Sequence, residues 1–117
     1  MAISEPYEID GVTVGTTELS VVSGTTTLQT VTDDGYYQFF VDDGGNMAKA
    51  DYFLMKVKEK VEGTGGTQKL LFPQRISQAQ AEIWAAPPVL LINGWDFTLT
   101  KVSGTDRAFD ASIRKVS

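Results

Sequence analysis

The fold class of this chain is decided by the stretch Val89-Leu90-Leu91-Ile92-Asn93-Gly94-Trp95-Asp96-Phe97-Thr98-Leu99-Thr100. Residues 89–92 are all apolar, and every second residue from 95 to 99 is apolar, which is typical of strands with a buried face. The Asn-Gly pair between them is the strongest short hairpin signal, because a type I′ turn needs positive φ at both central positions. The stretch therefore predicts two antiparallel strands, residues 89–92 and 95–102, joined as a hairpin.

Alternating strands and tight turns recur along the rest of the chain. Residues 52–61 and 69–76 flank the turn 62–67, residues 109–116 follow the turn 103–106, and residues 36–41 follow Asp33-Asp34-Gly35. Asp and Gly favour such turns because they tolerate positive φ, and no stretch spaces its apolar residues as a helix does. The sequence predicts an all-β fold, an antiparallel β-sandwich or small barrel of about seven to eight strands with an extended N-terminal arm.

The first 34 residues are rich in Thr, Ser and Gly and carry only scattered apolar residues. Thr favours extended backbone because its branched Cβ restricts χ1. We expect an N-terminal arm over residues 1–34, with short strands at 18–22 and 28–31, and an antiparallel β domain over residues 35–117. Such an arm can add a strand to a neighbour's exposed sheet edge. The candidate partner-binding residues are Ile3, Tyr7, Ile9, Val12 and Val14 of the arm, and Trp84.

Length and charge exclude several classes of function. The chain has 117 residues, which fits one domain, and its formal net charge is −5. An acidic domain repels nucleic acid and anionic lipid, so we expect neither a nucleic-acid partner nor a membrane partner. The N-terminus has neither the positive start nor the apolar run of a signal peptide, which favours folding in a cytoplasm.

The chain contains no His and no Cys, the most versatile side chains for catalysis and metal binding. Nucleophilic catalysis would need Ser or Thr beside a base, and only Lys or a carboxylate remains. Asp33-Asp34 and Asp42-Asp43 offer oxygen ligands for Ca²⁺, but both pairs stand beside Gly where turns are required. We therefore expect no catalytic residue, no metal site, no cofactor and no enzymatic activity.

Two surface features have a functional and a plain structural interpretation. Lys56, Lys58 and Lys60 form a one-sided basic stripe, which we interpret as a solvated strand face that deters edge pairing. Trp84 and Tyr36 would form a stacking platform for sugars if they were coplanar and exposed, since a carbohydrate-binding β-sandwich uses planar rings in this way. The alternative for Trp84 is that it covers a sheet edge or meets a neighbouring subunit.

Three stretches resemble the small β-rich structural proteins of tailed bacteriophages, in particular head decoration (cement) proteins. They are Asp34-Gly35-Tyr36-Tyr37-Gln38-Phe39-Phe40-Val41-Asp42, Val57-Lys58-Glu59-Lys60-Val61-Glu62 running into Gly65-Gly66-Thr67-Gln68, and Gly94-Trp95-Asp96-Phe97-Thr98-Leu99-Thr100 through to Ser112-Ile113-Arg114-Lys115. The resemblance spans residues 34–116 and brings no family functional residues with it.

The resemblance implies a non-enzymatic virion protein that binds the capsid surface and stabilises the lattice of the major capsid protein, after assembly in the host cytoplasm. Such proteins often form homo-oligomers, and a trimer is one option for this chain. A tail or neck structural component is the alternative within virions. A carbohydrate-binding β-sandwich module is the alternative from a different class.

Overall fold

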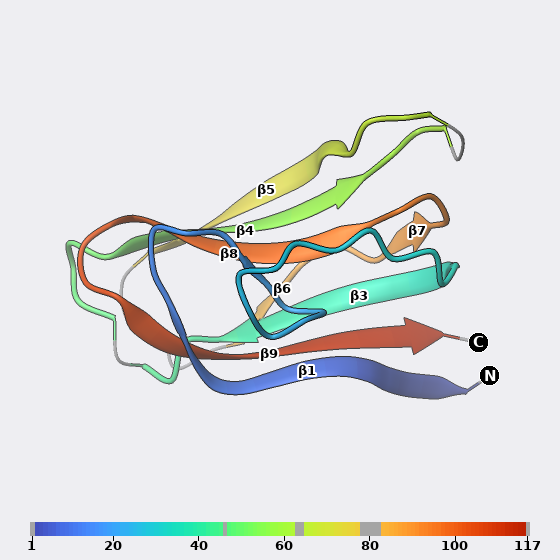
Figure 1. Ribbon diagram of the computed structural model, residues 1–117. Helices are drawn as coiled ribbons and strands as arrows, with labels where there is room; N and C mark the ends of the chain where they lie inside the picture. The colour runs from blue at the N-terminus through green and yellow to red at the C-terminus, as the bar shows by residue number, and fades with distance from the viewer. Residues whose placement is uncertain (1, 46, 63–64, 78–82, 117) are drawn as a thin grey trace.

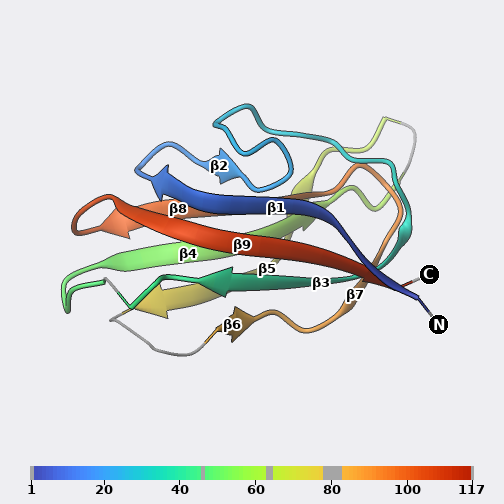
Figure 2. The same cartoon turned by 90° about the horizontal axis from the view of Figure 1, so that it is seen from below.

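The computed structural model describes residues 2–45, 47–62, 65–77 and 83–116. These residues form nine β-strands and no helix, in two antiparallel sheets that pack face to face (Figure 1 and Figure 2). The predicted all-β sandwich is confirmed. No described segment is a helix long and apolar enough to cross a membrane. Both ends of the chain lie at the same end of the sandwich, where Ile3 pairs with Val116.

Sheet A is built around the two strands β9 and β3. Its strands are β1 (Ile3–Val14), β9 (Arg107–Val116), β3 (Gly35–Asp42), β6 (Trp84–Ala85) and β7 (Val89–Leu91). They follow the order β1-β9-β3-β6, and β7 pairs with another part of β3. Most neighbours in this sheet are far apart in the sequence, so its outer face combines residues from both ends of the chain.

Sheet B contains the one predicted hairpin that forms as expected. Its strands are β2 (Leu19–Ser20), β8 (Asp96–Ser103), β4 (Tyr52–Glu59) and β5 (Lys69–Ser77), in the order β2-β8-β4-β5. Strands β4 and β5 pair antiparallel over their length, with a register irregularity after Val57. Residues 63 and 64 of the predicted turn between them lie outside the described residues.

The hairpin predicted around Asn93-Gly94 is wrong. Strand β7 pairs with β3 in sheet A, whereas β8 pairs with β4 and β2 in sheet B. Gly94 does adopt the positive φ that the turn requires, 56°, but there the chain crosses from one sheet to the other. Two backbone hydrogen bonds between Val31 and Trp95 occupy the position that a hairpin partner would take. Local turn chemistry is kept, and tertiary pairing decides where the turn leads.

The turn after β8 also crosses between the sheets, and a buried carboxylate holds it. Asp51, 2% exposed, accepts hydrogen bonds from the backbone of Thr105 and from the side chain of Arg107, at 2.9 and 2.7 Å. Gly104 passes so close that a Cβ there would lie 2.1 Å from Asp51 Oδ1, and its φ is 90°. Only glycine fits this crossing.

The segment expected to be an arm is strand β1, an edge strand of sheet A. Ile9 lies opposite Ala111 and Val12 opposite Phe109, with irregularities in register after Ser4 and after Ile9. The side chain of Ile9 is 6% exposed, so this part of the segment belongs to the core. Strand β1 is extended, as predicted for the arm, but it pairs with β9 of the same chain instead of standing free.

Between the sheets, aromatic side chains fill the core. The largest fully buried members are Trp95, Tyr37, Phe39, Phe53, Phe97 and Phe109. Tyr37 packs on Trp95 with ring centroids 4.6 Å apart. The Tyr37 hydroxyl and Trp95 Nε1 both donate to the carbonyl of Asp33, at 2.8 and 3.0 Å. The turn before β3 is therefore fixed to the core, and this sets the register of β3.

Candidate functional site

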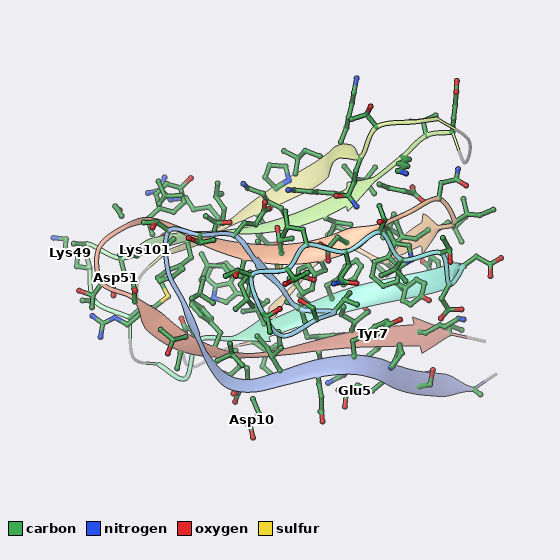
Figure 3. All side chains as sticks on the ribbon, in the orientation of Figure 1. Glu5, Tyr7, Asp10, Lys49, Asp51 and Lys101 are labelled. Atoms are coloured by element: carbon green, nitrogen blue, oxygen red, sulfur yellow. The ribbon has the colours of Figure 1, made fainter. Side chains whose placement is uncertain are left out.

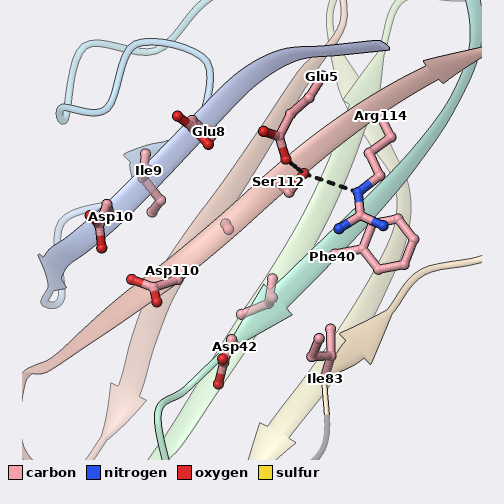
Figure 4. Close-up of a pocket in the computed structure, with 12 residues that line it drawn as sticks. Glu5, Glu8, Ile9, Asp10, Phe40, Asp42, Ile83, Asp110, Ser112 and Arg114 are labelled. Atoms are coloured by element: carbon pink, nitrogen blue, oxygen red, sulfur yellow. Dashed lines mark hydrogen bonds between the residues drawn. The ribbon is translucent and has the colours of Figure 1, made fainter. Parts of the chain in front are cut away.

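An open groove lies on the outer face of sheet A. Strand register places Phe40 beside Ser112 and Asp42 beside Asp110, with all four side chains on the face turned away from sheet B. The groove has a volume of about 280 Å³ and is lined from β1, β3, β9 and Ile83 (Figure 4). Since a strand alternates its side chains, the same residues that build the core on one face build this groove on the other.

The floor of the groove is an arginine stacked on an aromatic ring. The guanidinium carbon of Arg114 lies 4.1 Å from the centroid of the Phe40 ring. Arg114 Nε donates to the hydroxyl of Ser112 at 3.3 Å. A cation–π contact at an exposed site contributes about 0.5–1 kcal/mol, which is enough to favour one orientation of the guanidinium. Arg114 therefore presents its remaining N–H groups to the groove from a supported position.

Five carboxylates line the same groove. They belong to Glu5, Glu8, Asp10, Asp42 and Asp110. The Asp110 carboxylate is held in place by strand β1, since its Oδ1 accepts a hydrogen bond from the backbone N–H of Gly11 at 2.7 Å. In Figure 3, Asp10 points away from sheet B, into solvent. The groove is thus rich in acceptors and carries far more negative than positive charge.

Glu5 and Glu8 act on each other. The Ser112 hydroxyl and a hydrogen bond with Glu8 lower the pKa of Glu5. The same contact with Glu5, together with its charge, raises the pKa of Glu8. Both side chains are exposed. They form one acceptor pair at the rim of the groove.

A second feature of the same face is a line of apolar side chains, here called the apolar row. It consists of Ile3, Val116, Tyr36 and Leu90, each directly opposite the next in register across four strands. Ile3 is 68% exposed, Tyr36 43% and Leu90 73%. A hollow of about 400 Å³ lies beside the row, lined partly by Tyr36 and Leu90. The row crosses the sheet near the chain termini, and the groove extends from Glu5 and Arg114 beside the row toward the other end of the sheet.

The outer face of sheet B has a different character. Glu18 lies 2.7 Å from Lys58 Nζ and 3.9 Å from Lys56 Nζ, and it accepts from the hydroxyl of Thr98. Burial alone would raise the pKa of Glu18, but the hydrogen bonds from Lys58 and Thr98 outweigh it and hold that pKa below its ordinary value. The predicted solvated stripe is wrong for Lys56 and Lys58, because both are ion-paired.

The candidate partner-binding residues do not share one environment. Ile9 and Val14 are core residues, Tyr7, Val12 and Trp84 pack half-buried against the core, and Ile3 is exposed. The two rings proposed as a stacking platform do not lie together: Trp84 packs against the core, whereas Tyr36 belongs to the outer face. That platform is wrong.

The acidic turn residues act on their own backbone. Oδ1 of Asp42 accepts from the N–H of Gly44, and Oδ1 of Asp43 accepts from that of Gly45, both at 2.8 Å. This agrees with the turn interpretation of the sequence. Within the described residues, no group of three or more acidic side chains is arranged to hold a metal ion.

Sequence reasoning missed the groove itself. Alternation assigned Phe40 and Ser112 to the faces opposite Phe39 and Ile113, which is where the structure places them. What it lacked was the pairing of β9 with both β3 and β1, since these strands are distant in sequence. The available signal was the outward series Asp110, Ser112 and Arg114, which mixes both charges on one strand face.

No protein-family model and no curated protein matches the chain. Among solved structures, a mitogen from Yersinia pseudotuberculosis matches with a TM-score of 0.51 and 13% identity, covering 99% of this chain and 86% of that one. At this identity the likeness shows a shared fold alone.

Two looser likenesses are to a xylanase and to a xylan-binding domain. A Clostridium thermocellum xylanase 10B structure, containing CBM22-1 and GH10 modules with xylohexaose, gives a TM-score of 0.45 at 16% identity, over 72% of this chain. This chain spans only 17% of that xylanase chain. A xylan-binding domain from carbohydrate-binding module family 22 gives 0.44 at 13% identity, over 85% of this chain and 64% of that one.

Proposed function

We propose that this protein is a non-catalytic binding module that takes a neutral glycan in the groove of sheet A. The observation that carries the proposal is the groove itself, in which Arg114 is stacked on Phe40 and five carboxylates line the same face. Sugar hydroxyls donate and accept hydrogen bonds, and those made to charged groups are about twice as strong as neutral ones. A donor-rich, uncharged ligand suits this mixture.

The size and openness of the groove suit a small part of a longer ligand. Ligand pockets range from about 300 to about 1,000 Å³, so 280 Å³ corresponds to a short segment such as one or two sugar rings. The groove is open along the sheet, so a polymer can enter without its ends being threaded. Arg114 covers one face of the Phe40 ring, so binding would rest on hydrogen bonds more than on stacking.

The groove is poorly suited to two other tasks. The centre of a protein–protein interface is depleted of Asp and Glu, whereas carboxylates dominate here. A glycosidase needs a carboxylic acid whose pKa is raised by burial and a second carboxylate across the scissile bond. Glu8 has its raised pKa from the neighbouring Glu5, on the same strand and in solvent. Binding without bond cleavage fits these positions better.

The test compares two arginines with matched geometry. Arg114 lies 4.1 Å from the Phe40 ring in the groove, and Arg75 lies 4.1 Å from the Tyr52 ring on sheet B. Neutral polysaccharides are screened by affinity electrophoresis, and the best binder is titrated calorimetrically. Arg114→Ala should weaken binding at least about tenfold, equivalent to about 1.4 kcal/mol, and Arg75→Ala should leave it unchanged.

Salt separates a neutral ligand from a cationic one. Raising the salt from about 0.05 M to about 0.5 M shortens the screening length severalfold and should change the affinity for a neutral glycan less than about twofold. A steep loss with salt, an equal loss in both arginine variants, or no saturable binding to any neutral glycan would each count against the proposal.

A virion structural role is the second candidate. It is favoured by the resemblance of residues 34–116 to tailed-phage structural proteins, and by the exposed apolar row, which a glycan groove does not need. The protein would then bind the major capsid protein at the capsid surface through a sheet face. Co-sedimentation with purified capsids tests this role. Saturable binding that survives Arg114→Ala and is lost on Leu90→Lys would favour it over glycan binding.

A further inference from the structure

The apolar row is an ordered surface rather than a scatter of exposed residues. Ile3, Val116, Tyr36 and Leu90 come from four strands, and each side chain is fixed by register beside the next. Single exposed apolar residues are normal, whereas the contiguous apolar patches of a protein surface are often functional. Ile92, 61% exposed, adds to it next to the hollow beside Tyr36.

Charge on the same face limits which partner can cover the row. Asp10, Asp42 and Asp110 lie toward the end of sheet A that is remote from the termini, whereas Glu5 lies only two residues from Ile3 of the row. A flat, acidic partner that covered the whole face would meet these carboxylates. A partner that overlaps only the end of the sheet would bury the row and leave the three aspartates in water.

We infer that the apolar row is the contact between two copies of this chain, related by a twofold axis that runs parallel to the row, across the strands. This rotation stacks row on row and turns the strands of the second copy the opposite way. The two acidic ends then point in opposite directions and do not face each other. The inference stands on the row and does not depend on the glycan proposal.

The other face-to-face arrangement is disfavoured by electrostatics. A twofold axis parallel to the strands would also stack the rows, but it would bring the carboxylates around Asp110 of both copies together. Like charges that face each other across an interface disfavour association strongly. It would also place Ile3 of one copy over Leu90 of the other, whereas the inferred axis places Leu90 near Leu90 of the partner copy. The two arrangements therefore predict different neighbours.

The β1 edge of sheet A does not offer an easier route to association. Edge strand β1 carries Pro6 and two irregularities in register, and its flank bears Glu5, Glu8 and Asp10. Proline, bulges and charges are the features by which edge strands avoid pairing with other chains. A sheet face is thus the better docking surface, and the twofold contact leaves one groove open at each end of the pair, an arrangement that allows binding of two sites at once.

The experiment measures self-association of the purified chain. A row of four side chains is small beside the roughly 800 Å² per partner that standard interfaces bury, so we expect a weak dimer, visible by sedimentation equilibrium between roughly 10 µM and 1 mM. Leu90→Lys should weaken it at least about tenfold. Leu71→Lys is the matched control, because Leu71 is 45% exposed on β5 of the other sheet. Since both sites are exposed, circular dichroism should show folded proteins.

Cross-linking tells the two axes apart. The chain has no cysteine, so Leu90→Cys carries a single thiol, and a thiol-reactive linker of about 10 Å matches the spacing of packed sheets. The inferred axis predicts covalent dimers of Leu90→Cys, in amounts that fall when Ile3→Lys is added. A wild-type chain that stays monomeric to about 1 mM, an unchanged dimer in Leu90→Lys, or an equal loss in Leu71→Lys overturns the inference. So does a Leu90→Cys chain that dimerises without cross-linking.

Discussion

The outer faces of sheet A and sheet B both carry a stacked arginine and several charged side chains, but the charges are paired differently on the two faces. Each has an arginine stacked on an aromatic ring at 4.1 Å, Arg114 on Phe40 in sheet A and Arg75 on Tyr52 in sheet B. On sheet B Glu18 is paired with Lys58 and Lys56. On sheet A five carboxylates and one arginine line the same groove. On our proposals, the chain completes the first face by itself and leaves the second face for another molecule.

Sheet B is completed by the Thr-rich segment between β2 and β3. Asp96, fully buried on its outer face, accepts hydrogen bonds from the Ser20 hydroxyl at 2.7 Å and from the Gln29 N–H at 2.9 Å. Gln68 of the neighbouring loop donates to the carbonyl of Gln29 at 3.1 Å. Burial raises the pKa of Asp96 although these donors act to lower it. The outer face of sheet B is covered by this Thr-rich segment, whereas the outer face of sheet A carries the apolar row and the charged groove.

The largest expected effect comes from removing the edge of sheet A. Deletion of residues 1–14 removes β1, including the buried Ile9 and Val14, and leaves the aromatic core open beside β9. Losing a buried aliphatic side chain costs about 2–5 kcal/mol, and total stability is only about 5–15 kcal/mol. We expect an unfolded chain by circular dichroism and by amide NMR dispersion.

A shorter deletion is the matched control. The described residues 2–6 are all exposed, so a chain that begins after Pro6 should stay folded with a modest loss of stability. If the chain without residues 1–14 kept a dispersed spectrum, β1 would be a detachable arm after all, and sheet A would have its edge at β9.

The alternation of side chains predicted which face of a strand is buried, but it could not predict which strands pair. The alternation of 36–41 and 109–116 assigned inner and outer faces correctly, and the β4–β5 hairpin formed as predicted. Asn93-Gly94 failed because its local conformation fits a crossing between sheets as well as a hairpin. Strand β7 joins sheet A instead of pairing with β8, because Leu90 pairs with Tyr36, more than fifty residues away.

The groove could be predicted in composition but not in place. The acidic balance and the outward Arg114 are visible in the sequence, whereas their meeting requires β1 and β3 to flank β9. The buried residues of the N-terminal segment had a local signal that the prediction of an arm did not use. Ile9 alternates with Glu8 and Asp10, and Val14 follows Val12 across Thr13, but Gly11 interrupts the alternation between the two halves.

A smaller effect on stability is expected when the ion-paired Glu18 of sheet B is compared with the exposed Glu8 of sheet A. Glu18→Gln removes the charge that pairs with Lys58 at 2.7 Å on sheet B, and we expect a loss of about 1 kcal/mol in the free energy of unfolding. Glu8→Gln on sheet A removes a charge repelled by Glu5, so stability at neutral pH should stay the same or rise slightly. Urea unfolding of both variants measures this, and an equal loss would show that the faces are alike.

The same pair should differ in the sign of its pH dependence. The folded-state pKa of Glu18 is lowered, so its contribution is complete above the unfolded value of about 4.3 and is lost as pH falls through the folded pKa. The pKa of Glu8 is raised, so its unfavourable contribution is relieved on acidification. At pH 7 wild type should be more stable than Glu18→Gln and no more stable than Glu8→Gln. As the pH falls from 7 to 3, both differences in the free energy of unfolding should shrink.

The smallest effect is expected from the two stacked arginines, and its smallness is informative. Both rings are half-buried, both arginines are exposed, and both contacts measure 4.1 Å. Arg75→Ala and Arg114→Ala should therefore lower stability by similar amounts, no more than about 1 kcal/mol, in parallel thermal scans. A difference in ligand binding between these variants then cannot come from unfolding and must come from the faces themselves. If Arg114→Ala were much the less stable of the two, its stack would be a structural support of sheet A, and the contrast between the faces would lose its functional meaning.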